Sequence, residues 1–359
     1  MTETRTTCPY CGVGCGVIAS LNADGQVTVR GDEQHPANVG RLCVKGAALG
    51  ETVGLAGRLL FPEVDGERAT WTQALAAAGS RLREVIDRHG PQAVAFYASG
   101  QLLTEDYYAA NKLMKGFIGA ANIDTNSRLC MSSAVTGYKR ALGADVVPCS
   151  YEDVENSDLV VLVGSNAAWA HPVLYQRLAQ AKRDNPQMRV VVIDPRRTAT
   201  CDIADRHLAL APGSDGGLFV GLLNSIAASG AISGDFSDAP QALAIARNWD
   251  LDKVAQFCGL PRQQVADFYS EFIAAPRAIT LYTMGINQSA SGSDKCNAII
   301  NVHLASGKFG RPGCGPFSLT GQPNAMGGRE VGGLATMLAA HMNFETDDLR
   351  RLARFWGTE

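Results

Sequence analysis

Four cysteines near the start of the chain are the residues whose spacing points most clearly to chemistry. Cys8, Cys11 and Cys15 lie in CPYCGVGC, and Cys43 follows in RLCVKG after 27 intervening residues. Thiolates are soft ligands that suit either a zinc ion or an iron–sulfur cluster. A structural zinc site usually has two CxxC pairs, whereas an uneven triplet with a distant fourth cysteine is more common for [4Fe–4S]. The spacing therefore favours a [4Fe–4S] cluster, with zinc as the alternative.

The composition limits the classes of protein to which the chain can belong. Of its 359 residues 46% are apolar and 19% charged, which is ordinary for two or three globular domains. A net charge of −3 predicts no nucleic-acid partner, and the lack of a long apolar run predicts no membrane span. Only seven residues precede Cys8, so we expect no cleavable leader and a cytoplasmic protein. The other cysteines outside a ligand-spaced group are expected to be reduced thiols: Cys149, Cys201, Cys258, Cys296 and Cys314.

The order of the expected elements predicts an α/β fold. Residues 1–60 form a small cluster domain with short strands such as 26–30. Apolar spacing then predicts a helix from Thr72 to Gly90, a strand at 93–97 and a helix at 104–119. The segments 158–163 and 189–193 are apolar on both faces and flank a helix at 175–183. A further strand is expected at 278–284, with helices at 214–228, 261–274 and 293–306. This pattern predicts helix-covered, mainly parallel, Rossmann-like sheets.

Short polar loops follow the expected strands. Ligands of open parallel sheets bind outside the carboxyl ends of the strands, where backbone amides, a carboxylate and arginines suit a nucleotide. His171 is the only histidine in such a loop. The glycines at 12–16 follow no strand and open no helix, so they do not form a dinucleotide fingerprint. The loop candidates are Gly164, Ser165, Asn166, Asp194, Pro195, Arg196, Thr198, Gly213, Ser214, Asp215, Gly285 and Gln288.

The cluster motif followed by these loops resembles the molybdopterin oxidoreductases of the dimethyl sulfoxide reductase type. The resemblance covers the whole chain and is strongest in NSRLCMSSAVTGYKRALG from Asn126 to Gly143 and TGQPNAMGGREVGG from Thr320 to Gly333. Within that family the chain is most similar to the N-terminal part of cytoplasmic assimilatory nitrate reductase catalytic subunits. The resemblance implies a molybdenum bis(molybdopterin guanine dinucleotide) cofactor beside the [4Fe–4S] cluster.

The resemblance also implies roles for four catalytic residues. Cys130 matches the residue that gives its sulfur to molybdenum, and Met131 stands where formate dehydrogenases of the superfamily commonly carry histidine. Arg329 matches an arginine near the metal, where a guanidinium can hold planar nitrate by paired hydrogen bonds. Lys45 is expected between the cluster and one pterin. Beyond the strand-end loops, the residues expected at the dinucleotide cofactor are His171, Gln101, Asn126, Met284 and Gln322.

The implied reaction is oxygen-atom transfer from nitrate, which yields nitrite. Electrons would pass singly through the cluster from ferredoxin, flavodoxin or a reductase subunit. The family's catalytic chains are much longer than this one, so we expect residues 61–125 with 326–359 to form an incomplete α/β domain. An inserted cofactor domain is expected at 126–325. Two alternatives remain open at this point, a formate dehydrogenase-like enzyme and a truncated, non-catalytic iron–sulfur electron-transfer module. The choice between molybdenum and tungsten is also open.

Overall fold

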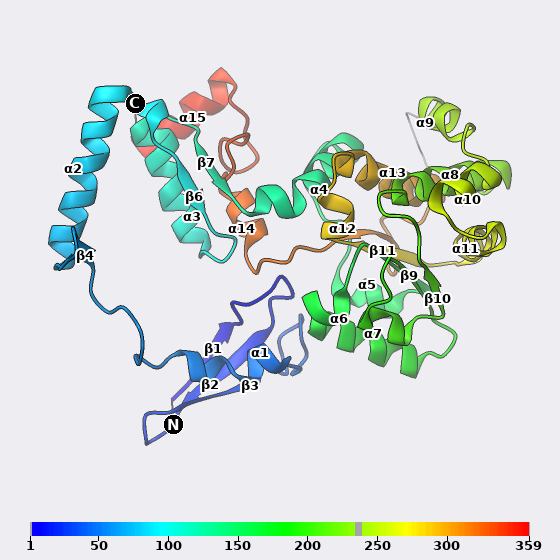
Figure 1. The fold of residues 1–359 in the computed structure, drawn as a ribbon, viewed down its shortest axis with the longest axis horizontal. Coiled ribbons are helices and arrows are strands. Elements are labelled where there is room, and N and C mark those ends of the chain that lie inside the picture. The colour runs from blue at the N-terminus through cyan, green and yellow to red at the C-terminus, as the bar shows by residue number, and fades with distance from the viewer. Residues whose placement is uncertain (1, 234–238, 359) are drawn as a thin grey trace.

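The computed structural model describes residues 2–233 and 239–358. Figure 1 shows three parts: a small N-terminal part, a part built around helices α2, α3 and α15, and a larger α/β part. The N-terminal part is a three-stranded antiparallel sheet in the order β1-β2-β3. Its elements are β1 (Thr2–Thr7), β2 (Gly16–Leu21), β3 (Val27–Gly31), α1 (Val44–Ala47) and the 3-10 helix η1 (Leu49–Thr52). Among the described residues, no helix is long and apolar enough to cross a membrane.

The second part combines chain segments from before and after the α/β part. Its strands β6 and β7 pair in parallel, and α14 and α15 return to it from the C-terminal end (Figure 1). The elements are β4 (Glu63–Val64), β5 (Glu67–Arg68), α2 (Trp71–His89), η2 (Pro91–Ala93), β6 (Phe96–Ala98), α3 (Thr104–Asn111), η3 (Lys112–Ile118), β7 (Ile123–Thr125), α14 (Ala325–Glu330) and α15 (Thr346–Trp356). The predicted domain boundaries stay a prediction.

Two predictions for this part need correction. The expected helix at 104–119 is α-helical only to Asn111 and continues as the π-helix η3. The expected strand at 93–97 begins later, because Pro91 opens a 3-10 turn.

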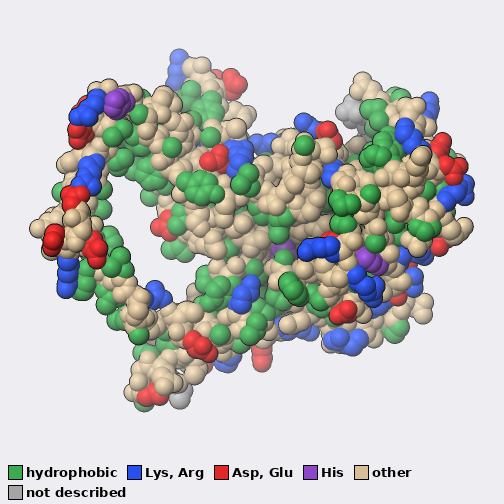
Figure 2. Space-filling model, in the orientation of Figure 1, with side chains coloured by type: hydrophobic (Ala, Val, Ile, Leu, Met, Phe, Trp, Pro, Cys, Tyr) green, Lys and Arg blue, Asp and Glu red, His purple; other side chains and the backbone are tan. Residues whose placement is uncertain are grey.

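Helix α2 begins at a capping box in which Thr70 accepts from the backbone of Gln73. No residue of α2 is buried. Figure 2 shows hydrophobic side chains along α2 and the chain that leads to it, with an opening beside them.

The third part is a doubly wound sheet. Its five strands are all parallel in the order β10-β9-β8-β11-β12, with helices on both faces (Figure 1). The strands are β8 (Leu159–Val163), β9 (Arg189–Ile193), β10 (Arg206–Leu208), β11 (Ala278–Tyr282) and β12 (Gly315–Ser318). The helices are α4 (Ser127–Leu142), α5 (Tyr151–Asn156), α6 (Ala167–Ala170), α7 (Pro172–Asp184), η4 (Ala199–Ile203), α8 (Asp215–Ala228), α9 (Ala239–Ala246), α10 (Leu251–Cys258), α11 (Arg262–Ala274), α12 (Met284–Asn287) and α13 (Gly292–Ala305).

Alternate residues of the central strands enter two different cores. Val161 and Val163 of β8 pack with α4, α8 and α13, whereas Val160 and Leu162 pack with α7 and with the cysteine-bearing N-terminal part. Successive side chains of a strand point to opposite faces, so a strand covered on both sides must be apolar throughout. The prediction of a buried parallel sheet from these two-sided apolar segments is confirmed.

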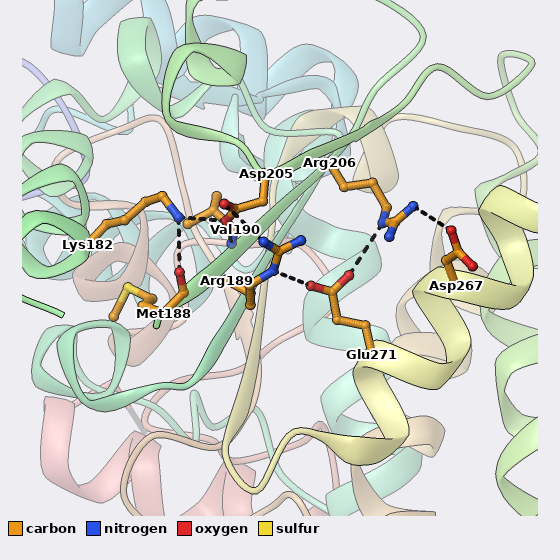
Figure 3. A network of polar contacts seen from close by, with 8 residues as sticks. All are labelled: Lys182, Met188, Arg189, Val190, Asp205, Arg206, Asp267 and Glu271. Carbon is orange, nitrogen blue, oxygen red and sulfur yellow. Dashed lines mark hydrogen bonds and ion pairs between the residues drawn. The ribbon is translucent and has the colours of Figure 1, made fainter. Parts of the chain in front are cut away.

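A chain of charges fastens one edge of this sheet to its helices (Figure 3). Asp205 accepts from Lys182 at 2.6 Å and pairs with Arg189 at 3.3 Å. Glu271 of α11 pairs with Arg189 at 2.7 Å and with Arg206 at 3.4 Å. Shared carboxylates link the amino ends of β9 and β10 to α7 and α11, at the opposite end of the strands from the candidate loops.

Candidate functional site

The four N-terminal cysteines face a common space. The amide of Cys8 donates to the carbonyl of Cys15 at 2.8 Å and closes the loop between them. Burial raises the pKa of Cys15 to about 12, and negative charge on Cys11, Cys8 and Cys43 adds to the rise. Among the described residues, no three His, Cys, Asp or Glu side chains are close enough to share one metal ion. The charge effects on Cys15 show that the four thiols lie near one another.

Asn38 fixes the two chain segments that carry these cysteines. Its side chain is fully buried. The amide oxygen accepts from Gly16 N at 2.8 Å, and the amide nitrogen donates to the carbonyls of Gly16 at 3.0 Å and Arg41 at 2.8 Å. Asn38 thus ties the neighbour of Cys15 to the turn before Cys43. The sequence did not predict this residue, because a lone asparagine in a loop has no distinctive spacing.

Lys45 is an exposed residue of α1, two positions after Cys43. Burial raises the pKa of the Cys11 thiol, and a backbone hydrogen bond from Val13 and the positive charge of Lys45 partly oppose that rise. The same charge acts on His171, whose pKa is lowered first by burial and then further by Lys45. The charge of Lys45 thus reaches both Cys11 and His171, while its expected place between the cluster and one pterin stays a prediction.

Thr320 connects the cluster loop to Cys130. The amide of Gly12 donates to Gly321 O at 3.1 Å, and a Cβ on Gly12 would lie 2.2 Å from the Thr320 carbonyl oxygen. The hydroxyl of Thr320 is 3.8 Å from Cys130 Sγ. The Thr320 carbonyl also lies 2.6 Å from Nε2 of buried His171. Only glycine permits this approach at position 12, so the loop between two cysteines rests directly on the segment that touches Cys130.

Cys130 occupies a break in helix α4. The side chain is buried, and the next residue, Met131, has φ −146° and ψ 16° inside an otherwise helical segment. The carbonyl of Cys130 accepts from Asn287 Nδ2 at 3.1 Å, and Ser133 donates to the carbonyl of Asn287 at 2.7 Å. Asn287 thus supports the broken turn from α12. Irregular backbone held by neighbouring side chains is common at functional sites, and no sequence signal had predicted this break or Asn287.

Arg329 forms a buried ion pair with Asp145. Its Nε lies 3.0 Å from Asp145 Oδ2, and the two side chains are 3% and 2% exposed. Nε and Nη1 of Arg329 and Oδ1 of Asp145 have no aligned hydrogen-bond partner in the described part of the chain. Asp145 therefore balances the charge while guanidinium donors remain for another acceptor. Within the described residues, 2–233 and 239–358, no hydrogen bond or ion pair joins Arg329 directly to Cys130.

A pocket at the carboxyl ends of the strands gathers many of the predicted loop residues. It lies where strand order reverses between β8 and β11, the usual ligand site of such sheets. Gly164, with φ +55°, accepts from the amide of Gly285 at 3.1 Å and brings two loops together. The pocket has a volume of about 220 Å³, and the predicted residues that line it are Gly164, Asp194, Pro195, Arg196, Gly213, Asp215 and Gly285.

The pocket contains acceptors suited to a nucleotide. Asp215 accepts from Lys295 through Oδ2 at 2.9 Å, and both side chains are buried. Within the described residues its Oδ1 is buried without a partner, as is the hydroxyl of Ser165, which follows Gly164 in the chain. A buried polar atom without a partner is costly, so these atoms fit a ligand that supplies N–H or O–H donors. Asp194 is partly satisfied within its own turn, because Oδ1 accepts from Arg196 N at 2.8 Å.

The remaining predicted cofactor residues lie outside this pocket. Asn126 Oδ1 accepts from Gly100 N at 2.8 Å, and a Cβ on Gly100 would collide with Gln322, so these residues meet near Thr320. Met284 is also there, since a Cβ on Gly321 would contact its Cε at 3.7 Å.

Five other predicted residues serve loop geometry or face outward. Thr198 accepts from Thr200 N at 3.3 Å, while Asn166 accepts from the Thr200 hydroxyl at 2.9 Å. Ser214 donates to Ala211 O at 2.7 Å. Gln101 and Gln288 are exposed. None of these contacts requires a ligand, so their cofactor roles stay predictions.

Together, the cysteine-lined N-terminal sheet and the doubly wound nucleotide fold define a redox protein that joins an iron–sulfur cluster to a dinucleotide-type cofactor. The comparison with known families is consistent with this class. Residues 1–54 match the molybdopterin oxidoreductase Fe4S4 domain, and residues 58–351 match the molybdopterin oxidoreductase family. The chain belongs to the molybdopterin oxidoreductases. These matches indicate a [4Fe–4S] cluster and molybdopterin-bound molybdenum as cofactors, so the zinc alternative is set aside.

Similar proteins specify the relationship further. The chain is 93% identical over its whole length to a nitrate reductase of Klebsiella oxytoca, of which it covers 42%. It is 47% identical over 99% of its length to a nitrate reductase of Shewanella frigidimarina, of which it covers 39%. Acetylene hydratase from Pelobacter acetylenicus has a similar fold, with a TM-score of 0.76 at 21% identity over 85% of this chain and 43% of that protein. The chain thus spans less than half the length of these relatives.

Proposed function

We propose that this chain forms the cluster-bearing and cofactor-binding part of a molybdenum-dependent nitrate reductase, which reduces nitrate to nitrite. The observation that carries this proposal is the junction at Thr320, which touches both the cysteine loop and Cys130. The likeness to proteins named nitrate reductase supports the choice of substrate. The bound molybdenum cofactor would supply the oxygen-atom transfer chemistry.

The residues of this chain would position the reacting groups. Cys8, Cys11, Cys15 and Cys43 would hold the cluster, and Cys130 would ligate molybdenum. The ammonium of Lys45 would favour electron passage between the two centres electrostatically. These roles rest on the mutual proximity of the thiols and of Lys45 with His171.

Arg329 would hold nitrate. Its buried guanidinium has donors without an aligned partner, and charge-assisted, paired hydrogen bonds suit a planar oxyanion. Asp145 would keep the guanidinium oriented through Nε. Met131, which lies directly after Cys130, would contribute an apolar side chain to the same site. This role for Met131 rests on its buried position at the break in α4.

At the other end of the cofactor, the pocket between the strand-end loops would bind guanosine. Asp215 Oδ1 and Ser165 Oγ would accept from base or ribose donors, and Gly164 and Gly285 would allow close approach of the ligand. His171, Asn126, Met284 and Gln322 would lie toward the pterins, as would Gln101 and Gln288. Thr198, Asn166 and Ser214 would fix the loops between the two ends.

The compartment and the electron donor are further parts of the proposal. All ten cysteines are free thiols, which suits a reducing compartment, and we propose a cytoplasmic, assimilatory enzyme. Relatives include an assimilatory nitrate reductase and a periplasmic one. Ferredoxin, flavodoxin or a reductase subunit would deliver electrons. We propose no nucleic-acid or membrane partner, and domain limits near residues 60, 125 and 325.

Metal analysis with turnover tests the function. The full-length protein is purified without oxygen, its iron and molybdenum are counted, and oxidation of reduced viologen is followed with nitrate. About four irons and one molybdenum with nitrate-dependent oxidation support the proposal. Formate oxidation without nitrate reduction would favour the formate dehydrogenase alternative. Iron without molybdenum would favour the electron-transfer module.

Within that assay, Arg329→Lys tests the nitrate site. Lysine keeps the charge but loses the paired donors, so the KM for nitrate should rise about tenfold or more with molybdenum retained. Arg350→Lys is the matched control, because Arg350 is 73% exposed on α15. An unchanged kcat/KM in Arg329→Lys would remove Arg329 from the nitrate site.

A further inference from the structure

One lysine ammonium lies inside a group of converging backbone carbonyls. Lys115 belongs to the π-helix η3, and its Nζ donates to four carbonyl oxygens of one loop. The distances are 2.6 Å to Gly332, 3.1 Å to Leu334 and 3.5 Å to Leu338, and Met337 O also accepts from it. Carbonyl groups that replace a hydration shell in this way are the usual site of a bare monovalent cation. Here the cation is covalently attached to the protein.

The loop that supplies these carbonyls has no regular secondary structure of its own. Gly332 has φ +84°, and a Cβ there would lie 2.4 Å from Leu338 O. Asn111, one helical turn before Lys115, donates to Val331 O at 2.7 Å and to Leu338 O at 2.9 Å. Converging carbonyl dipoles repel one another, so the loop needs positive charge at its centre to stay closed.

This loop follows directly from the helix that carries Arg329. The amide of Gly332 donates to Arg329 O at 3.0 Å, and the amide of Gly333 donates to Gly328 O at 2.7 Å. The residue Gly332 is therefore held by Lys115 through its oxygen and by Arg329 through its nitrogen. A shift of the loop would pass to Arg329 through a single residue.

The surroundings of Lys115 make its charge costly without these carbonyls. Burial lowers the pKa of Lys115 to about 7, and the negative charge of Asp124 opposes that effect. The ring of Phe344 lies 5.8 Å from Nζ and adds no acceptor. The loop carbonyls are thus the main groups that replace water around the ammonium.

We propose that Lys115 is a positioning residue, whose ammonium serves as a tethered monovalent cation that holds the loop 332–338 closed and so fixes Arg329. The link to nitrate rests on the proposed function, since it assumes that Arg329 binds the substrate. The closure of the loop does not depend on that assumption.

Chemical rescue tests the proposal in the cofactor-loaded, full-length protein. Lys115→Ala removes the ammonium and leaves an empty space among the four loop carbonyls. Hydrogen exchange of the amides at 328–338 should therefore accelerate about tenfold or more. Added methylammonium should enter the empty space and restore the slow exchange in a saturable manner. Lys115→Met also removes the charge but fills the space, so methylammonium should not restore it. Lys253→Ala, at an exposed position of α10, should exchange as the parent does.

The nitrate KM separates the two halves of the proposal. Lys115→Ala should raise it about tenfold with molybdenum content unchanged, and methylammonium should lower it again. Unchanged exchange at 328–338, or equal effects of methylammonium on the alanine and methionine variants, would overturn the tethered cation. Rescued exchange with an unaltered KM would overturn the link to Arg329. If Arg329→Lys itself leaves the nitrate kinetics unaltered, the proposed nitrate role of Arg329 fails. The exchange data then still test whether Lys115 holds the loop 332–338 closed.

Discussion

The buried pair of Arg329 and Asp145 should show strong energetic coupling. The two side chains are 3% and 2% exposed with Nε and Oδ2 3.0 Å apart, so either single replacement leaves a charge that water cannot reach. Loss of one partner from a buried pair costs about 3–5 kcal/mol of unfolding free energy. Asp145→Ala should fall in that range. Arg329→Ala should also be destabilising, because it leaves the buried carboxylate of Asp145 without its partner.

A double-mutant cycle measures this coupling. Urea unfolding followed by circular dichroism gives the unfolding free energies of the parent, both single variants and the double variant. Because the double variant contains neither charge, its loss should be smaller than the sum of the single losses by about 2–3 kcal/mol. Arg350 and Asp347, an exposed pair on α15, provide the control cycle, with coupling below about 1 kcal/mol. Additive losses at Arg329 and Asp145 would refute the reasoning that the two charges balance each other.

The other predictions concern the metal ligand, the nucleotide pocket and acid stability. Cys130→Ala should abolish molybdenum retention while the absorption spectrum of the cluster persists; loss of both signals would contradict their separate roles. Lys295→Met leaves Asp215 unpaired and should weaken binding of guanosine monophosphate more than inosine monophosphate by calorimetry; equal losses would exclude contact of Asp215 with the 2-amino group. Burial lowers the pKa of His303 from 6.5 to about 3. Below pH 6.5 the unfolded chain therefore binds a proton at His303, whereas the folded chain keeps this side chain neutral. The contribution of His303 to the unfolding free energy is thus complete above pH 6.5 and falls by about 2 kcal/mol at pH 5. His303→Asn should flatten the slope of unfolding free energy between pH 7 and 5, and an unchanged slope would assign that loss to other groups.

The local patterns of the sequence predicted the elements well. Strands β8 and β9 were expected because apolar residues fall on both of their faces, as in a sheet covered on both sides, and β11 was expected as a further strand. Helices α8, α11 and α13 lie within one or two residues of their expected limits. The π-helix η3 was missed, because the sequence from Lys112 to Ile118 is also compatible with an α-helix and tertiary contacts of Lys115 choose between the two.

The sequence by itself predicted the four cysteines as cluster ligands and the motif around Cys130, and it determined the parallel sheet and the polar loops at its strand ends. These follow from residue type and from spacing along the chain, where local backbone geometry dominates. The tertiary structure alone decided the pairing of Asp145 with Arg329, the contact of Thr320 with both Gly12 and Cys130, and the enclosure of Lys115 by a loop 217 residues away. Such partners are set by strand order and by the return of the chain to an earlier part, and spacing along the sequence carries no information about either.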